Sequence, residues 1–119
     1  MGGTMSKFAL FPFRGEPMCF IHVLLNALNM HERGHEAVIV LEGDSCALVG
    51  AMAREDHQLH TLYTKAKEAG LIAGACRACS TQLGAADAVR AEGIELVGSM
   101  HNHPSMAEYA ERGFTVIPF

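Results

Sequence analysis

Short apolar runs alternate with longer amphipathic segments along this chain, and this alternation limits the possible folds more than any other feature. The run Ala37–Leu41 is unbroken and rich in β-branched residues, as expected of a strand that is buried on both faces. Parallel strands joined by helical crossovers form a sheet that helices cover on both sides. The alternation therefore predicts the order βαβαβαβαβ, as a three-layer α/β/α sandwich with a five-stranded, mainly parallel sheet.

The boundaries of the predicted elements follow from hydrophobic spacing and from the glycines that end helices. In the first helix, Met18, Ile21 and Leu24 recur at helical spacing, and Gly34 ends the segment. We expect strands at Lys7–Phe13, Ala37–Leu41, Leu71–Ala75, Ile94–Gly98 and Phe114–Ile117. We expect helices from Glu16 to Gly34, from about Gly50 to Ala69 with or without a break near Asp56, from Ser80 to Glu92, and from Pro104 to Arg112.

Length and charge narrow the class of protein. The chain has 119 residues, of which 50% are hydrophobic and 18% charged, which suits a single domain over residues 1–119. We expect residues 1–6 to form a flexible N-terminal extension. The net charge of −4 lacks the basic footprint of a nucleic-acid-binding protein. No apolar run approaches the roughly 18 residues that span a bilayer, so we expect a soluble, cytoplasmic protein without a membrane partner.

The reactive side chains cluster where the predicted strands end. Ligands of open parallel sheets bind outside the carboxyl ends of the strands. The residues that follow the first four strands are, in order, Arg14, Glu16 and Cys19; Glu42, Asp44, Ser45 and Cys46; Cys76, Arg77 and Cys79; and His101, Asn102 and His103. All four cysteines and a His-x-His pair are therefore predicted on one rim of the sheet.

The pair Cys76 and Cys79 has the spacing of a redox or metal-binding CxxC motif. It lies between a strand end and a helix start, where free N–H groups and the helix dipole stabilise a thiolate, and Arg77 adds positive charge. We therefore expect a lowered thiol pKa. The alternative is that Cys76 finishes a buried strand and Cys79 packs as a small hydrophobic residue.

The other candidate site residues, two histidines and two cysteines, can also be explained without a function. In an extended segment, His101 and His103 would point to the same side, as metal ligation or substrate contact requires. The same two histidines also suit an exposed turn before Pro104. Buried packing is the favoured interpretation for Cys19 and Cys46, because free cysteine is often fully buried.

The segment Leu71–Gly84 resembles the DsrE/DsrF-like (DsrEFH) sulfur-relay family. In that family a cysteine ends a strand and a glycine follows eight residues later, as Cys76 and Gly84 do here. The order of elements and the ending Ser105–Phe119 are also similar. The resemblance implies a single DsrE-like α/β domain, cytoplasmic, in a homotrimer or hexamer, whose Cys76 carries sulfur as a persulfide. This chain would be a CxxC-containing member, although the family cysteine often stands alone and the segment from His101 to His103 is not part of its motif.

The first functional hypothesis is a sulfur-transfer or thiol-redox role, with sulfur donor and acceptor proteins as partners and without a cofactor. Cys76 would be the nucleophile, Cys79 the resolving thiol and Arg77 a stabiliser of the thiolate. Substrate or partner contacts would come from His101, His103, Glu16 and Asp44.

The second hypothesis is a metal-binding module. Cys76, Cys79, His101 and His103 form a Cys₂His₂ set that suits tetrahedral zinc, and Cys19 or Cys46 could replace one ligand. A third hypothesis is an oligomeric scaffold without catalytic activity. The sequence leaves these alternatives open.

Overall fold

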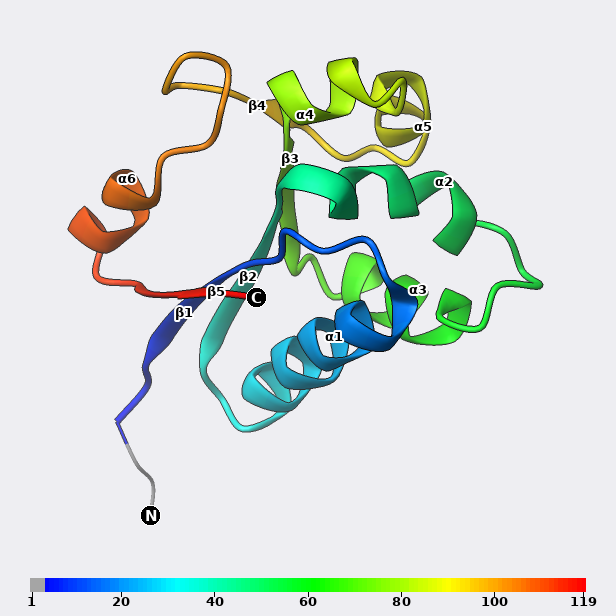
Figure 1. The fold of residues 1–119 in the computed structure, drawn as a ribbon. Coiled ribbons are helices and arrows are strands. Elements are labelled where there is room, and N and C mark those ends of the chain that lie inside the picture. Colours follow the sequence, from blue (N-terminus) through cyan, green and yellow to red (C-terminus); the bar gives the residue numbers. More distant parts are fainter. Residues whose placement is uncertain (1–3) are drawn as a thin grey trace.

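A computed structural model describes residues 4–119 and shows an α/β fold (Figure 1). Its five strands form one sheet in the order β4-β3-β2-β1-β5, and each neighbouring pair is parallel. The prediction of a five-stranded, mainly parallel sheet is confirmed. The strands are β1 (Lys7–Phe11), β2 (Glu36–Leu41), β3 (Ile72–Cys76), β4 (Leu96–Val97) and β5 (Thr115–Pro118).

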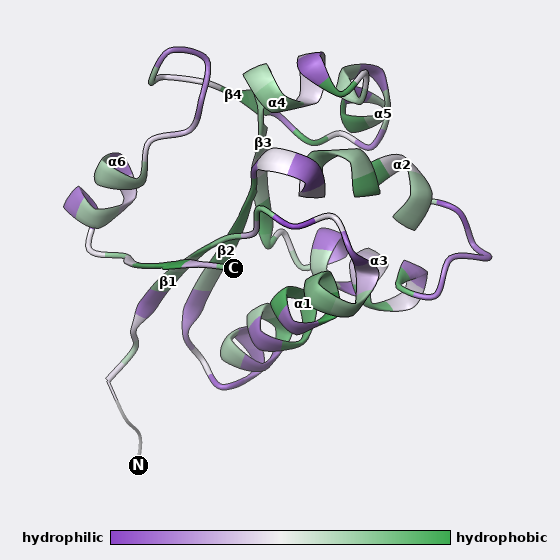
Figure 2. Cartoon of the chain, in the orientation of Figure 1, coloured by the Kyte–Doolittle hydropathy of each residue, from purple (hydrophilic) through white to green (hydrophobic). Residues whose placement is uncertain are grey.

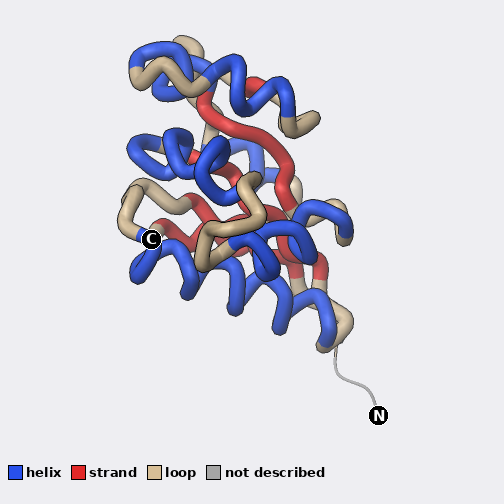
Figure 3. The backbone as a smooth tube through the Cα atoms, turned by 90° about the vertical axis from the view of Figure 1, so that its right-hand side faces the viewer, coloured by secondary structure: helices blue, strands red, loops and turns tan. Residues whose placement is uncertain are grey.

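The helices divide unequally between the two faces of the sheet. Strands β1 to β4 are added in one direction, so right-handed crossovers place the intervening helices on the same face. The chain then returns to add β5 beside β1, which places the last helix on the opposite face (Figure 1). In Figure 3, which is turned so that the thicker layer faces the viewer, helices lie in front of the strands. The thicker layer contains α1 (Pro17–Glu32), α2 (Leu48–Met52), α3 (His60–Glu68), α4 (Arg77–Gln82) and α5 (Ala86–Ala91), and the thinner layer contains α6 (Met106–Glu111).

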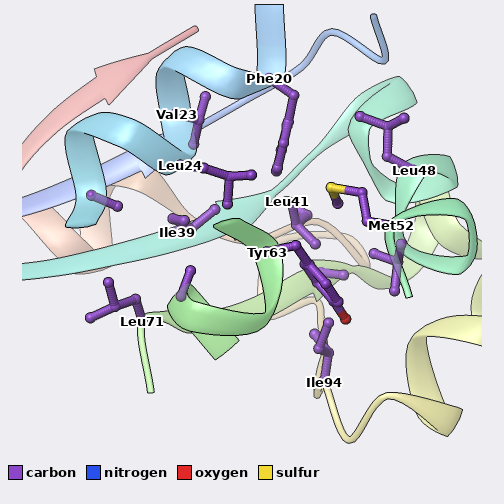
Figure 4. Close-up of a cluster of buried hydrophobic side chains, with 14 of the residues drawn as sticks. Phe20, Val23, Leu24, Ile39, Leu41, Leu48, Met52, Tyr63, Leu71 and Ile94 are labelled. Atoms are coloured by element: carbon purple, nitrogen blue, oxygen red, sulfur yellow. The ribbon is translucent and has the colours of Figure 1, made fainter. Parts of the chain in front are cut away.

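Alternating residues of the central strands form two separate hydrophobic clusters. Leu10 and Ile39 belong to the larger cluster, which also contains Phe20 and Leu24 of α1. Figure 4 shows Ile39, Phe20 and Leu24 within it. Their strand neighbours, such as Phe11, belong to a smaller cluster on the α6 face. This separation follows from the two-residue period of a strand. The strands are correspondingly among the most hydrophobic segments of the ribbon (Figure 2).

Two predicted helices are interrupted. The segment expected at Gly50–Ala69 contains α2 and α3, with irregular backbone between them, so the break near Asp56 is present. The segment expected at Ser80–Glu92 is divided at Gly84, whose φ of 70° is left-handed and ends α4. Helix α4 also begins earlier than expected, directly after Cys76. Cys79 consequently lies in its first turn.

The predicted strand boundaries also need small corrections. β1 ends at Phe11 rather than Phe13, because Pro12 has no N–H to continue the ladder. The predicted strand Ile94–Gly98 is reduced to the two residues of β4, which pairs with β3 alone. The residues after β2 form a 3₁₀ helix, η1 (Gly43–Ala47).

The expected N-terminal extension lies partly outside the described residues, which begin at Thr4. Ser6 is held by two hydrogen bonds. Its backbone N–H donates to Nδ1 of His35 at 3.0 Å, and its carbonyl accepts from the N–H of Glu36 at 2.9 Å. Among residues 4–119, no helix combines the length and the apolarity needed to cross a membrane.

Candidate functional site

Four potential metal ligands meet where β2, β3 and the segment after β4 end. They are Glu42, which follows β2; Cys76, the last residue of β3; Cys79 in α4; and His103 in the loop after β4. One ligand atom from each of the four lies within 4.8 Å of all the others. Adjacent parallel strands carry these residues to the same rim, so the sheet order explains how residues distant in the sequence come together.

Cys76 is the buried centre of the cluster. Its Sγ lies 3.2 Å from Nδ1 of His103 and accepts the backbone N–H of Cys79 at 3.3 Å, as the N-cap of α4. Burial raises the pKa of the Cys76 thiol well above its ordinary value, the N–H of Cys79 offsets part of that rise, and Glu42 adds to it. The expectation of a lowered thiol pKa is therefore wrong for Cys76, because desolvation outweighs the effect of the helix start.

Arg77 does not supply the expected stabilisation. Its guanidinium donates a hydrogen bond to the carbonyl of Leu96 at 3.1 Å, on the neighbouring strand. Adjacency in the sequence thus does not bring this positive charge to the thiol.

Glu42 is the ligand that sequence reasoning missed. It is only 7% exposed, and its Oε1 lies 3.7 Å from both Sγ of Cys79 and Nδ1 of His103. The Ser45 hydroxyl holds the backbone at this position, because its oxygen lies 2.7 Å from the carbonyl oxygen of Glu42 and 2.9 Å from that of Pro12 and its one proton is shared between them. The available signal was position, because Glu42 is the first residue after a strand buried on both faces.

A tight turn brings His103 to the thiols. Met100 and His103 exchange backbone hydrogen bonds of 2.9 and 2.8 Å, and His101 and Asn102 adopt φ values of 49° and 68°. The carbonyl of Asn102 accepts the N–H of Ala78 at 2.9 Å, which ties the turn to α4. A Cβ at Gly98 would lie 2.7 Å from Cα and the carbonyl carbon of Asn102, so a glycine permits this close approach.

The same turn separates the two histidines of the His-x-His pair. The expected extended segment would have pointed both to one side, but left-handed backbone at His101 and Asn102 ends that alternation. His101 is exposed and outside the cluster, whereas His103 lies inside it. The predicted Cys₂His₂ set is therefore replaced by Cys76, Cys79, His103 and Glu42.

The remaining predicted site residues lie around the cluster or away from it. Cys46 is fully buried in the larger hydrophobic cluster, and burial raises the pKa of its thiol to about 11. Cys19 is half-buried on α1, and Glu16 is exposed with its carboxylate 3.8 Å from Arg14. Asp44 is exposed and lines a pocket beside the cluster. All four cysteines are free thiols.

The pocket beside the cluster gives access to one of its two thiols. It has a volume of about 270 Å³, and Cys79 and His103 line it whereas Cys76 does not. Its other lining residues are Gly43, Asp44, Ala78, Gln82 and Leu83. A small molecule in this pocket would therefore contact Cys79 before it contacts Cys76.

Comparison with known proteins identifies relatives of unknown function. An uncharacterized protein of Methanocaldococcus jannaschii is 26% identical over 97 residues, which cover 82% of this chain and 77% of that protein. An uncharacterized protein of Archaeoglobus fulgidus is 36% identical over 42 residues, which cover 35% of this chain and 69% of that protein. The chain belongs to one family with the Archaeoglobus fulgidus protein, whose description names no activity.

One solved structure has the same fold. A conserved protein of unknown function from Bacteroides thetaiotaomicron superposes with a TM-score of 0.71 at 22% sequence identity, covering 98% of this chain and all of that one. No model of a known protein family matches the sequence. The resemblance to the DsrE/DsrF-like family accordingly stays a hypothesis.

Proposed function

We propose that Glu42, Cys76, Cys79 and His103 bind a divalent transition metal, with zinc as the best match. The observation that carries this proposal is the convergence of two sulfur atoms, one nitrogen and one oxygen within 4.8 Å of one another. Thiolate, imidazole and carboxylate are the ligands that zinc takes in proteins. The structure holds these donors on three neighbouring segments of one rim.

Three of the distances between donor atoms are close to those of tetrahedral coordination. Zinc bonds of 2.0–2.3 Å give tetrahedron edges of about 3.3–3.8 Å. The distance from Sγ of Cys76 to Nδ1 of His103 is 3.2 Å, and those from Oε1 of Glu42 to Nδ1 of His103 and to Sγ of Cys79 are both 3.7 Å. Small side-chain movements would therefore bring these donors into bonding positions.

The burial of the site also favours a metal. The thiols of Cys76 and Cys79 and the carboxylate of Glu42 lie together where Cys76 is fully buried and Glu42 is almost fully buried. Ionised thiolates and a carboxylate repel one another in such a place, and a divalent cation would compensate their charge. Because the protein would fill all four coordination positions of the ion, the ion would mainly have a structural or regulatory role. It would join the ends of β2 and β3 to the loop after β4.

The test is metal binding by matched variants of the full chain. Metal-stripped, reduced protein is titrated with cobalt(II), whose absorption bands report thiolate ligands, and then with zinc, whose stoichiometry is measured by mass spectrometry. We expect one ion per chain. Loss of a residue that only hydrogen-bonds to a metal ligand costs roughly 10–100-fold in metal affinity. His103→Ala removes a ligand itself and should cost more, and Glu42→Gln should also weaken binding.

His101→Ala and Asp44→Asn are the matched controls, since the first removes an imidazole and the second a carboxylate charge just outside the cluster. Both should bind zinc like the wild type. Equal losses in His101→Ala and His103→Ala, or no bound metal in the wild type, would contradict the proposal.

Sulfur transfer is a second candidate, which the pairing of a pocket-lining thiol with a second thiol favours. Cys79 would take the outer sulfur of a donor persulfide, so that the donor leaves as a thiol and Cys79 becomes a persulfide. The nearby Cys76 would then attack the inner sulfur of Cys79, which releases sulfide and leaves a Cys76–Cys79 disulfide. Native mass spectrometry before and after a sulfane-sulfur donor would show added sulfur, any bound metal and the predicted homotrimer or hexamer in one measurement. Sulfur that accumulates on Cys76→Ser and is absent from Cys79→Ser would favour this candidate over a metal site.

A further inference from the structure

The two thiols of the cluster differ sharply in their access to solvent. Cys76 is 0% exposed, whereas Cys79 is partly exposed and lines the 270 Å³ pocket together with His103. A reagent that enters this pocket meets the sulfur of Cys79 first. The order of reaction at the CxxC pair is therefore set by burial, and it is the reverse of the order expected from the sequence, in which Cys76 reacts first.

We infer that Cys79 is an oxidation site through which hydrogen peroxide controls metal binding, with Cys76 as the resolving thiol. The inference rests on the proposed metal site for its consequence, because it describes how that site would be emptied. The oxidation itself depends only on the two thiols. Peroxide is small enough to enter the pocket beside Cys79 and His103.

Two bonds form in sequence. The Cys79 sulfur attacks one oxygen of hydrogen peroxide, the O–O bond breaks, and Cys79 becomes a sulfenic acid while one water leaves. The sulfur of Cys76 then attacks the Cys79 sulfur, the S–S bond forms, the S–O bond breaks, and a second water leaves. Two thiols are oxidised to one disulfide, and one peroxide is reduced to two waters. The two thiol protons end in the waters; if the sulfurs begin as metal-bound thiolates, two solvent protons replace them.

The geometry supports Cys76 as the partner in the second step. The two sulfur atoms lie within 4.8 Å of each other, and the N–H of Cys79 already points to Sγ of Cys76 at 3.3 Å. To form a disulfide, the two sulfur atoms must approach to a length near 2.05 Å. Cys19 lies on α1 and is not part of the cluster.

Disulfide formation would release the metal. Thiolate is the form of cysteine that binds a metal ion, and the disulfide leaves only Glu42 and His103 as ligands. Reduction of the disulfide would restore all four donors. The site would therefore bind metal under reducing conditions and lose it under oxidising ones.

The experiment treats reduced full-length protein with stoichiometric hydrogen peroxide, in a zinc-loaded and a metal-free sample. Peptide mass spectrometry maps disulfides and sulfenic acids, the latter trapped with dimedone, and a zinc-binding dye records release. We expect a Cys76–Cys79 disulfide in both samples and release of zinc in step with it. In the wild type, iodoacetamide should label Cys79 about tenfold faster than Cys76, a measurement that does not depend on any variant.

Variants separate the two roles. Cys76→Ser should accumulate the dimedone adduct at Cys79, whereas Cys79→Ser should leave Cys76 unmodified over the same time. Cys19→Ser removes another partly exposed thiol and should behave like the wild type. Faster labelling of Cys76, a disulfide to Cys19 or Cys46, or no disulfide would overturn the inference.

The two samples keep the inference distinct from the proposed function. Zinc that binds but is not released by peroxide would overturn the inference and leave the metal site standing. A protein that never binds zinc but forms the Cys76–Cys79 disulfide through a Cys79 sulfenic acid would overturn the metal site and retain the oxidation step.

Discussion

Nδ1 of His103 lies 3.2 Å from Sγ of Cys76, although the two residues are 27 positions apart in the chain. This contact depends on the turn after β4, which folds back until the carbonyl of Asn102 accepts the N–H of Ala78. The position of His103 in the cluster therefore depends on this turn. A substitution that disturbs the turn should weaken metal binding even where the substituted residue is not a ligand.

Gly98→Ala is expected to weaken zinc binding without removing a ligand. Its Cβ would lie 2.7 Å from the Asn102 backbone, so the turn that holds His103 must shift. We expect a loss of about 1–3 kcal/mol in the free energy of unfolding and an affinity for zinc lower by about 10–100-fold. Isothermal titration calorimetry and urea denaturation measure the two effects.

Gly50→Ala is the control, because it adds the same methyl group within α2, beside the Cβ of Ala88 at 3.3 Å. It should leave the zinc affinity unchanged. A Gly98→Ala protein with wild-type affinity would show that the turn does not position His103.

Glu92 should make stability fall in acid. Hydrogen bonds from the Tyr63 hydroxyl at 2.6 Å and the Lys67 ammonium at 3.0 Å lower the pKa of the Glu92 carboxyl from its ordinary value of 4.5. A lowered folded-state pKa gives stability that is present above 4.5 and lost as the pH falls through the lower, folded value. Urea denaturation between about pH 3 and pH 6 measures this slope.

Glu92→Gln keeps an acceptor for Tyr63 but removes the titrating charge, so its unfolding free energy should change less with pH in this window. Glu55→Gln removes an exposed carboxylate outside the network and should retain the wild-type profile. An unchanged slope in Glu92→Gln would refute the assignment.

Leu24→Ala and Leu25→Ala should have very different effects on the free energy of unfolding, although the two residues are adjacent. Leu24 is 0% exposed in the larger hydrophobic cluster, whereas Leu25 is 46% exposed. Truncation of Leu24 should cost about 2–5 kcal/mol of unfolding free energy through lost contacts and a cavity. Truncation of Leu25 should change it by at most about 0.5 kcal/mol, and equal losses in urea denaturation would contradict the assigned face of α1.

Several local features were predictable because they depend on neighbouring residues. The unbroken run Ala37–Leu41 predicted a strand buried on both faces, and most of it is buried. Helices divide or end at glycines, as at Gly84, because a left-handed residue cannot continue a helix. The division at Gly84 was nevertheless not predicted, since the apolar spacing on either side of it suits one continuous helix.

The amino-acid sequence determined the alternating α/β pattern and the rim on which Cys76, Cys79 and His103 lie, because strand ends can be located from local hydrophobic spacing. Only the tertiary structure decided that Glu42 joins this cluster and that His101 does not. It also decided that Cys76 is buried with a raised thiol pKa while Cys79 faces a pocket. Those outcomes depend on strand order, on the backbone angles of one turn and on desolvation by distant residues, and none of these is a property of the local sequence.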